Sequence, residues 1–208
     1  ADVLAKAGAY EVKVTATSQG DNSETAEVST TTTILPVYGV TLVGEGELKG
    51  ATMDMVAGVT YTLIVTNTGN TDDTIILGSS AEVGIGGSVL GSFRKSKDQE
   101  LSTSQLKITL APGASTEVIF TATGDLLTKS GEYKIKVTAT SQGDNTKSAE
   151  VATTTTILPV YDVTLAGVGD LITETANAAE GVSYTLTITN AGNTDDVIDL
   201  ATSGDATA

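Results

Sequence analysis

The chain contains no cysteine, no histidine and no tryptophan. Without thiols or imidazoles it can form neither disulfides nor the usual His/Cys zinc sites, and it lacks the commonest general base. Basic residues are scarce as well, with 11 Lys and Arg against 26 Asp and Glu and a net charge of −15. Nucleic acid is therefore not expected as a partner, because binding phosphates needs a positive patch, whereas divalent cations are attracted. With so few catalytic groups, the composition predicts a protein that is not an enzyme.

Long apolar runs are missing too, so no membrane insertion is expected in this segment. The chain shows no signal peptide and no initiating Met, as expected for a mature or excised segment of a longer chain. The absence of cysteine does not by itself place the protein inside a cell, because disulfides are only one way to stabilise an extracellular domain.

What the chain does contain is a long internal repeat. Residues 10–22 return as 133–145, residues 30–38 as 153–161 and residues 66–73 as 189–196, each time 123 positions later. Over the whole overlap about 49 of 85 aligned positions are identical without a gap, which indicates a tandem array. A unit of 123 residues has the size of an independent domain, so each unit can bury its own core.

The repeating unit has the composition of a β-sheet protein. Val, Ile and Thr dominate the stretches between turns and no stretch shows helical apolar spacing, so the fold class is predicted to be all-β. In residues 59–66 apolar and polar side chains alternate, as in a half-buried strand. Further strands are expected at residues 37–43, 74–77, 105–110, 116–122, 133–139 and 147–157, with a weaker one at 89–93. About seven to eight strands per repeat predict a two-sheet Greek-key β-sandwich.

This strand pattern divides the chain into three parts. Residues 35–157 are predicted to be one complete repeat, residues 1–34 the C-terminal strands of a partial repeat, and residues 158–208 the N-terminal strands of a further one. Pro36 and Pro159 each lie between two strands with no flexible spacer, so the connections should be short and stiff. The array is expected to be a rod.

Three motifs follow one another in the complete repeat: residues 61–73, Leu110–Val118 and Gly131–Ser141. In this order and spacing they resemble the immunoglobulin-like repeats of bacterial and archaeal surface proteins, which occur in adhesins, stalks and accessory modules of secreted glycosidases. The resemblance covers the complete repeat and both partial ones. It implies tandem immunoglobulin-like sandwiches and an extracellular or cell-surface location. It also implies that Tyr10 and Tyr133 are corner tyrosines whose hydroxyls bond to the backbone.

Acidic loops provide the candidate metal site. In an immunoglobulin-like topology, carboxylates of two repeats converge on each joint: Asp2 with Asp72, Asp73 and Asp144 at the first, and Asp125 with Asp195 and Asp196 at the second. Calcium takes about six to eight oxygen ligands, so calcium is the expected cofactor, stiffening the array at its joints. In the alternative interpretation the sequence Asn-x-Gly-Asn-Thr-Asp-Asp is only a turn, whose Asx side chains bond their own backbone. The spacing is not that of an EF-hand loop.

Together these features predict a structural rod, fibre or filament that self-associates through strand or edge contacts. One sharper hypothesis is a head-to-tail polymer in which the terminal partial repeats complete one another. Residues 1–34 and 158–208 supply only 85 of the 123 positions, which favours an arbitrary window on a longer chain instead. The alternative function is an adhesin or carbohydrate-binding accessory module with a surface ligand, and the lack of Trp for stacking on sugars disfavours it.

Overall fold

The computed structural model describes residues 5–52, 57–80, 82–83, 88–95, 104–125, 128–167 and 183–204. Every regular element within these residues is a β-strand, which confirms the all-β prediction. The described part of the chain contains no helix that is long and apolar enough to cross a membrane.

The strands form two-stranded sheets at the ends and two five-stranded sheets between them. The N-terminal pair consists of β1 (Gly8–Thr17) and β2 (Thr25–Ile34), and the C-terminal pair of β13 (Val163–Gly167) and β14 (Leu186–Asn190). One five-stranded sheet has the order β3 (Val40–Glu45), β5 (Val59–Asn67), β10 (Ser115–Gly124), β8 (Ser88–Arg94), β7 (Glu82–Val83). The other has the order β4 (Lys49–Thr52), β12 (Ser148–Ile157), β11 (Gly131–Ser141), β6 (Asp73–Ser80), β9 (Gln105–Leu110).

The two five-stranded sheets pack on each other in a sandwich-like arrangement, which we call the central sandwich, and share one core. In β5 the side chains of Tyr61, Leu63 and Val65 are buried, while Thr62 and Ile64 between them are partly exposed, as a period of two predicts. The Tyr61 hydroxyl connects the sheets: it donates to the carbonyl oxygen of Thr154 on β12 at 2.7 Å and lies 2.7 Å from the Thr155 hydroxyl. Burial of such a side chain contributes about 1.5–3 kcal/mol, so this core stabilises the sandwich independently of the ends.

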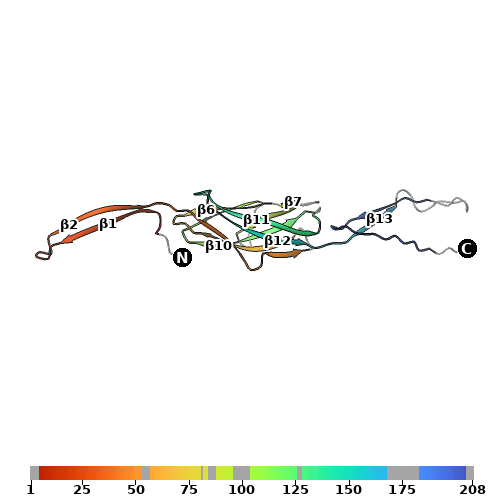
Figure 1. The fold of residues 1–208 in the computed structure, drawn as a ribbon, viewed down its shortest axis with the longest axis horizontal. Helices are drawn as coiled ribbons and strands as arrows, with labels where there is room; N and C mark the ends of the chain where they lie inside the picture. The colour runs from red at the N-terminus through yellow and green to blue at the C-terminus, as the bar shows by residue number, and fades with distance from the viewer. Residues whose placement is uncertain are drawn as a thin grey trace.

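The three parts follow one another along the long axis of the molecule, with the two pairs extending from opposite ends of the central sandwich (Figure 1). Each pair repeats a register found in the sandwich. Residues of β1 and β2 pair as their counterparts 123 positions later pair in β11 and β12, and β13 pairs with β14 as β3 pairs with β5. The division at residues 34 and 157, the Greek-key order and the assignment to immunoglobulin-like repeats stay predictions.

Two strands were not predicted from the sequence. β4 has the residues Lys-Gly-Ala-Thr, which show no apolar alternation, and β7 is only two residues long. β4 forms because it pairs in parallel with β12 at the edge of the sheet, from Lys49 beside Thr154 to Thr52 beside Ile157. Conversely, β3 begins at Val40 and not at residue 37, because residues 35–39 bond to another loop.

Candidate functional site at the joints

Two short segments without strand structure connect the three parts, and we call the regions around them the joints. The first joint consists of the linker 35–39, the loop 67–72 of the central sandwich and residues 5–7. The second joint consists of the linker 158–162, the loop 190–195 and residues 128–130. Each linker contains a proline, which fixes its own backbone and holds the residue before it in an extended conformation. A pre-formed linker of this kind can present its amides and carbonyls to the loop.

Asn70 lies at the centre of the first joint and is only 3% exposed. Its Oδ1 accepts a hydrogen bond from the Val37 amide at 2.7 Å, and its Nδ2 donates to the carbonyl oxygens of Ala5 at 3.0 Å and Leu35 at 3.1 Å. The main-chain N–H of Asn70 donates to the Val37 carbonyl, and its own carbonyl accepts from the Ala7 amide, both at 2.9 Å. One residue therefore ties the sandwich loop to the linker and to the segment that precedes β1.

Asn193 occupies the same place in the second joint. Its Oδ1 accepts from the Val160 amide at 2.7 Å, and its Nδ2 donates to the Leu158 carbonyl at 3.1 Å. Its main-chain N–H donates to the Val160 carbonyl at 3.0 Å, and its carbonyl accepts from the Ser130 amide at 2.9 Å. Each partner lies 123 positions after its counterpart in the first joint. We call this recurring set of bonds the asparagine clamp.

A second asparagine shapes the loop that carries the clamp. The buried Asn67 donates from Nδ2 to the carbonyl oxygens of Thr71 at 2.8 Å and Leu110 at 2.9 Å, and its Oδ1 accepts from the Gly69 amide at 2.9 Å. Asn190 makes the matching bonds within the loop of the second joint. This Asx turn is the one that the turn interpretation of the sequence expected, and it presents the next asparagine to the linker.

The glycine between the two asparagines allows the linker to approach. A Cβ on Gly69 would clash with the carbonyl oxygen of Val37, and a Cβ on Gly192 would clash with that of Val160. Because the clashing atoms belong to the backbone, neither can move aside without breaking the clamp. The sequence Asn-x-Gly-Asn is thus explained residue by residue at both joints.

The corner tyrosines fix the third segment of each joint. The Tyr10 hydroxyl donates to the Lys6 carbonyl at 2.8 Å, and the Tyr133 hydroxyl donates to the Lys129 carbonyl at 2.9 Å. The predicted bond from each hydroxyl to the backbone is confirmed. Lys6 and Lys129 directly precede Ala7 and Ser130, whose amides donate to the main-chain carbonyls of the clamp asparagines. Each tyrosine therefore holds one of these amides in position.

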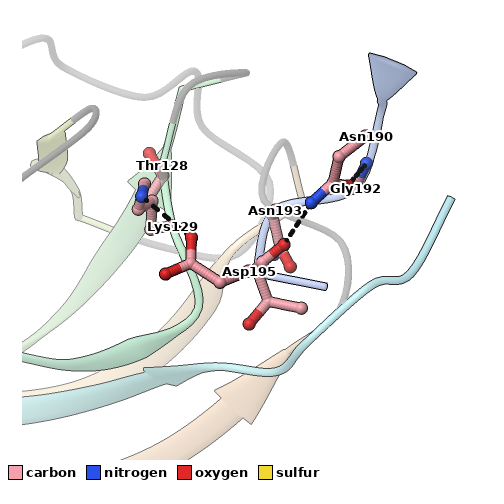
Figure 2. Close-up of a pocket in the computed structure, with 7 residues that line it drawn as sticks. Thr128, Lys129, Asn190, Gly192, Asn193 and Asp195 are labelled. Atoms are coloured by element: carbon pink, nitrogen blue, oxygen red, sulfur yellow. Dashed lines mark hydrogen bonds and ion pairs between the residues drawn. The ribbon is translucent and has the colours of Figure 1, made fainter. Parts of the chain in front are cut away.

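The second joint also contains a shallow pocket of about 260 Å³, lined by Thr128, Lys129, Asn190, Gly192, Asn193, Thr194 and Asp195. Figure 2 shows the ammonium group of Lys129 turned toward the Asp195 carboxylate, at 3.4 Å. Since the Asp195 side chain is almost fully exposed, this ion pair contributes little, about 0–1 kcal/mol. None of the described residues that line the pocket is aromatic, so it offers no ring for a sugar to stack on.

The acidic residues expected at the first joint have separate partners. Asp72 is exposed, whereas Asp73 is buried, with Oδ1 accepting from the Gly143 amide at 3.1 Å and Oδ2 without a hydrogen-bond partner. The Asp144 carboxylate accepts from the hydroxyl and the amide of Thr146 at 2.7 and 3.0 Å. These bonds, the hydroxyl first, lower the pKa of Asp144 because they stabilise the charged carboxylate. Asp2 lies outside the described residues.

The acidic residues expected at the second joint are also distributed. The Asp125 carboxylate bonds to Thr128 at 3.0 Å and to the Ser88 amide at 3.3 Å, within the central sandwich. Asp195 faces Lys129, and Asp196 accepts from the amide that follows it in the chain. Across the described residues no group of three acidic side chains lies close enough to hold a metal ion. Calcium at the joints stays a prediction.

Sequence reasoning treated the asparagines of these loops as turn residues or as possible calcium ligands, and did not predict that Asn70 and Asn193 bond to the linkers. The signal that could have found them is the comparison of the two copies. Between residues 66 and 73 the position between Asn67 and Gly69 changes from Thr68 to Ala191, while both asparagines and the glycine recur. A loop that only had to turn would not need its last asparagine to face the linker.

No protein-family model matches the chain, and no curated protein matches it in sequence. Among solved structures, a family 123 glycoside hydrolase from Clostridium perfringens matches 59% of the chain at 10% identity and a TM-score of 0.39, and the chain spans 27% of its length. A conjugative transposon lipoprotein from Bacteroides eggerthii matches 57% at 13% identity, with 98% of its own length covered and a TM-score of 0.33. A chaperone–tip adhesin complex of CFA/I fimbriae matches 74% at 12% identity, with 67% of its length covered and a TM-score of 0.31. Likenesses at these TM-scores carry no argument about function.

Proposed function

We propose that the chain is a structural, non-enzymatic part of a rod, fibre or filament on the outside of a prokaryotic cell, built from tandem immunoglobulin-like sandwiches. The observation that carries the proposal is the asparagine clamp, four of whose hydrogen bonds recur between equivalent residues at both joints. A joint that only connected two domains would not need the same set of bonds twice. The recurrence is what an array needs if each unit has to be held in the same orientation to the next.

The clamp resists bending because its bonds lie on different chain segments. At the first joint the bonds of Asn70 reach the linker on one side and residues 5–7 on the other. Any tilt of the N-terminal pair relative to the central sandwich has to lengthen several of them together. Each hydrogen bond contributes about 0.5–1.5 kcal/mol net, so the set makes a bent joint rare at room temperature.

The charge of the chain limits the partners and cofactors that it can take. The net charge of −15 disfavours nucleic acid and keeps separate rods soluble through repulsion. Calcium is the cofactor we propose for stiffening the joints further, and the buried, unpartnered Oδ2 of Asp73 supports it as an atom available to a cation. Self-association through strand contacts would link rods into a fibre.

Small-angle X-ray scattering tests the proposal in solution. We expect the wild-type monomer, separated from any oligomers by size-exclusion chromatography, to scatter as an extended particle with a single maximum dimension. The monomer of the double variant Asn70→Ala/Asn193→Ala should show a shorter average dimension because its joints bend. The matched control is Asn145→Ala, an exposed asparagine outside the clamp. Identical scattering of the wild type and the double variant would reject the clamp as the source of stiffness.

A further inference from the structure

A pull along the chain reaches the central sandwich at two places. It enters through the linker 35–39, which leads into β3 and β4, and it leaves through the linker 158–162, which follows β12. The two linkers lie at opposite ends of the sandwich, and its strands run lengthwise between them (Figure 1). The strands next to the linkers therefore carry any tension that passes from one joint to the other.

β12 extends from the neighbourhood of the first joint to the second. The hairpin tip that precedes it contacts the first linker, since a Cβ on Gly143 would clash with the ring of Tyr38. Its other end continues directly into the second linker at Leu158. β4 pairs with β12 in parallel, so the two strands point the same way. Tension draws β4 toward the first joint and β12 toward the second, and the two strands are pulled past each other lengthwise.

Hydrogen bonds fasten this parallel pair at both of its ends. The Thr154 amide donates to the Leu48 carbonyl at 2.8 Å just before β4, and the Leu158 amide donates to the Thr52 carbonyl at 2.9 Å at the end of β4. The residues of β4 lie in register with β12 between these two bonds. When paired strands are pulled past each other lengthwise, all the bonds between them are strained together, whereas a pull across the strands would break them one at a time.

β4 also lies against the core and connects to the second clamp. A Cβ on Gly50 would clash with the Val59 side chain at the start of β5, so the backbone of β4 is in direct contact with that side chain. Leu158, whose amide bonds to β4, accepts a hydrogen bond at its carbonyl from Nδ2 of Asn193. The parallel pair therefore continues into the asparagine clamp without an unbonded segment between them.

We propose that this protein bears tension along the rod and that the parallel pair of β4 and β12 is the element that keeps the central sandwich closed under it. While the pair is intact, a pull on the first linker can release only the chain before β4, because β4 stays bonded to the strand that the second linker pulls. Once the pair breaks, the sandwich extends. The inference rests on the proposed function and goes beyond it, because alignment needs only stiff joints, whereas resistance to tension needs a strong unit.

Two proline variants on β4 test the parallel pair. The carbonyl of Thr52 bonds to the chain at the end of β12, and in a parallel ladder the amide of the same residue faces the same neighbour. Thr52→Pro removes that amide. Ala51→Pro is the matched control, because the amide of the adjacent residue faces the free edge of the sheet, where proline is tolerated.

A second pair of variants decides the question if Thr52→Pro does not fold. Gly50→Ala pushes β4 away from Val59, whereas Gly78→Ala on β6 has open space for its Cβ. Ile108→Val completes the set, since it weakens the core at β9, a strand that adjoins neither linker. Denaturant unfolding shows which variants fold and how much stability each of them loses.

Optical tweezers measure the lifetime of the central sandwich under constant tension. The chain has no cysteine, so Ser29→Cys on β2 and Thr164→Cys on β13, both exposed, attach DNA handles on either side of the sandwich in the full chain. Relative to their controls, Thr52→Pro and Gly50→Ala should shorten the lifetime about fivefold or more, the effect of losing one hydrogen bond. Ile108→Val should lower the denaturant midpoint but change the lifetime less than about twofold, because β9 is still in place when the parallel pair breaks.

Two results would overturn the inference. If Thr52→Pro and Gly50→Ala have the lifetimes of their controls, the parallel pair does not carry the tension. If Ile108→Val shortens the lifetime as much as Thr52→Pro does, the lifetime follows the overall stability of the sandwich and not the pair. Neither result changes the scattering test of the clamp, because a rod can be straight without resisting a pull. Failure of the inference and failure of the proposed function are therefore distinguishable.

Discussion

Replacing Asn70 by Ala is the sharpest perturbation of the first joint. The change removes three side-chain hydrogen bonds, one from the Val37 amide and two to the carbonyls of Ala5 and Leu35. Each contributes about 0.5–1.5 kcal/mol net, which gives a loss of about 1.5–4.5 kcal/mol from the free energy that keeps the joint closed. The main chain of the loop is retained, so the central sandwich should stay folded.

Hydrogen exchange at the Ala7 amide measures this loss directly. That amide bonds to the main-chain carbonyl of residue 70, which the variant keeps, so its exchange reports opening of the joint and not removal of its acceptor. A loss of about 1.5–4.5 kcal/mol corresponds to exchange roughly 10- to 2000-fold faster, or to the unprotected rate if that is reached first. The Ser130 amide, bonded to Asn193 at the second joint, is an internal control in the same molecule and should be unchanged.

The reasoning fails in two distinguishable ways. If Ala7 exchanges at the same rate in the wild type and in Asn70→Ala, the side chain does not hold the joint closed. If Ser130 accelerates together with Ala7, the substitution has loosened the whole sandwich, and the effect does not belong to the joint. Asn145→Ala should leave both amides unchanged.

The remaining predictions concern the turns, the linker, the corner and the ions. Thr146→Val should raise the pKa of Asp144 toward 3.8 in an NMR titration, since it removes the hydroxyl bond that lowers it, and no shift would contradict this cause. Because folding lowers that pKa, the bond's stabilisation is present above pH 3.8 and is lost as the pH falls through the folded-state pKa. Gly69→Ala should accelerate exchange at the first joint as strongly as loss of the clamp, whereas Gly78→Ala, with open space for its Cβ, should not. Tyr133→Phe should cost about 1 kcal/mol in denaturant unfolding, and an unchanged midpoint would contradict the corner bond. Calcium should raise the melting temperature relative to chelator, and equal temperatures would reject calcium at the joints.

The all-β fold and most strand positions could be predicted from the sequence because alternation decides them. In residues 59–66 the buried and exposed side chains fall where the period of two places them. The corner tyrosines were predictable for a similar reason, since a Tyr that opens an alternating strand can reach the backbone of the turn before it. Local pattern was sufficient wherever a residue's partner is near in the chain.

Features that depend on distant partners could not be predicted in this way. β4 exists because β12 lies beside it, more than 90 residues later, and its own sequence carries no strand signal. Asparagine is a residue type typical of turns, so the sequence alone assigns Asn70 to one. Its role at the joint comes from hydrogen-bond partners at residues 5, 7, 35 and 37. The acidic residues were expected to converge because their loops meet. Instead, the carboxylates of Asp125 and Asp144 accept hydrogen bonds from threonine hydroxyls within their own turns.

The most direct measurement is the distribution of distances across the first joint, obtained by double electron–electron resonance. The chain has no cysteine, so Glu11→Cys on β1 and Lys107→Cys on β9, both exposed, provide two unique sites for spin labels. The account predicts one narrow distance distribution in the otherwise wild-type protein and a broad one when Asn70→Ala is added. A distribution that is already broad with the clamp intact would contradict the claim that the joints hold the array in line.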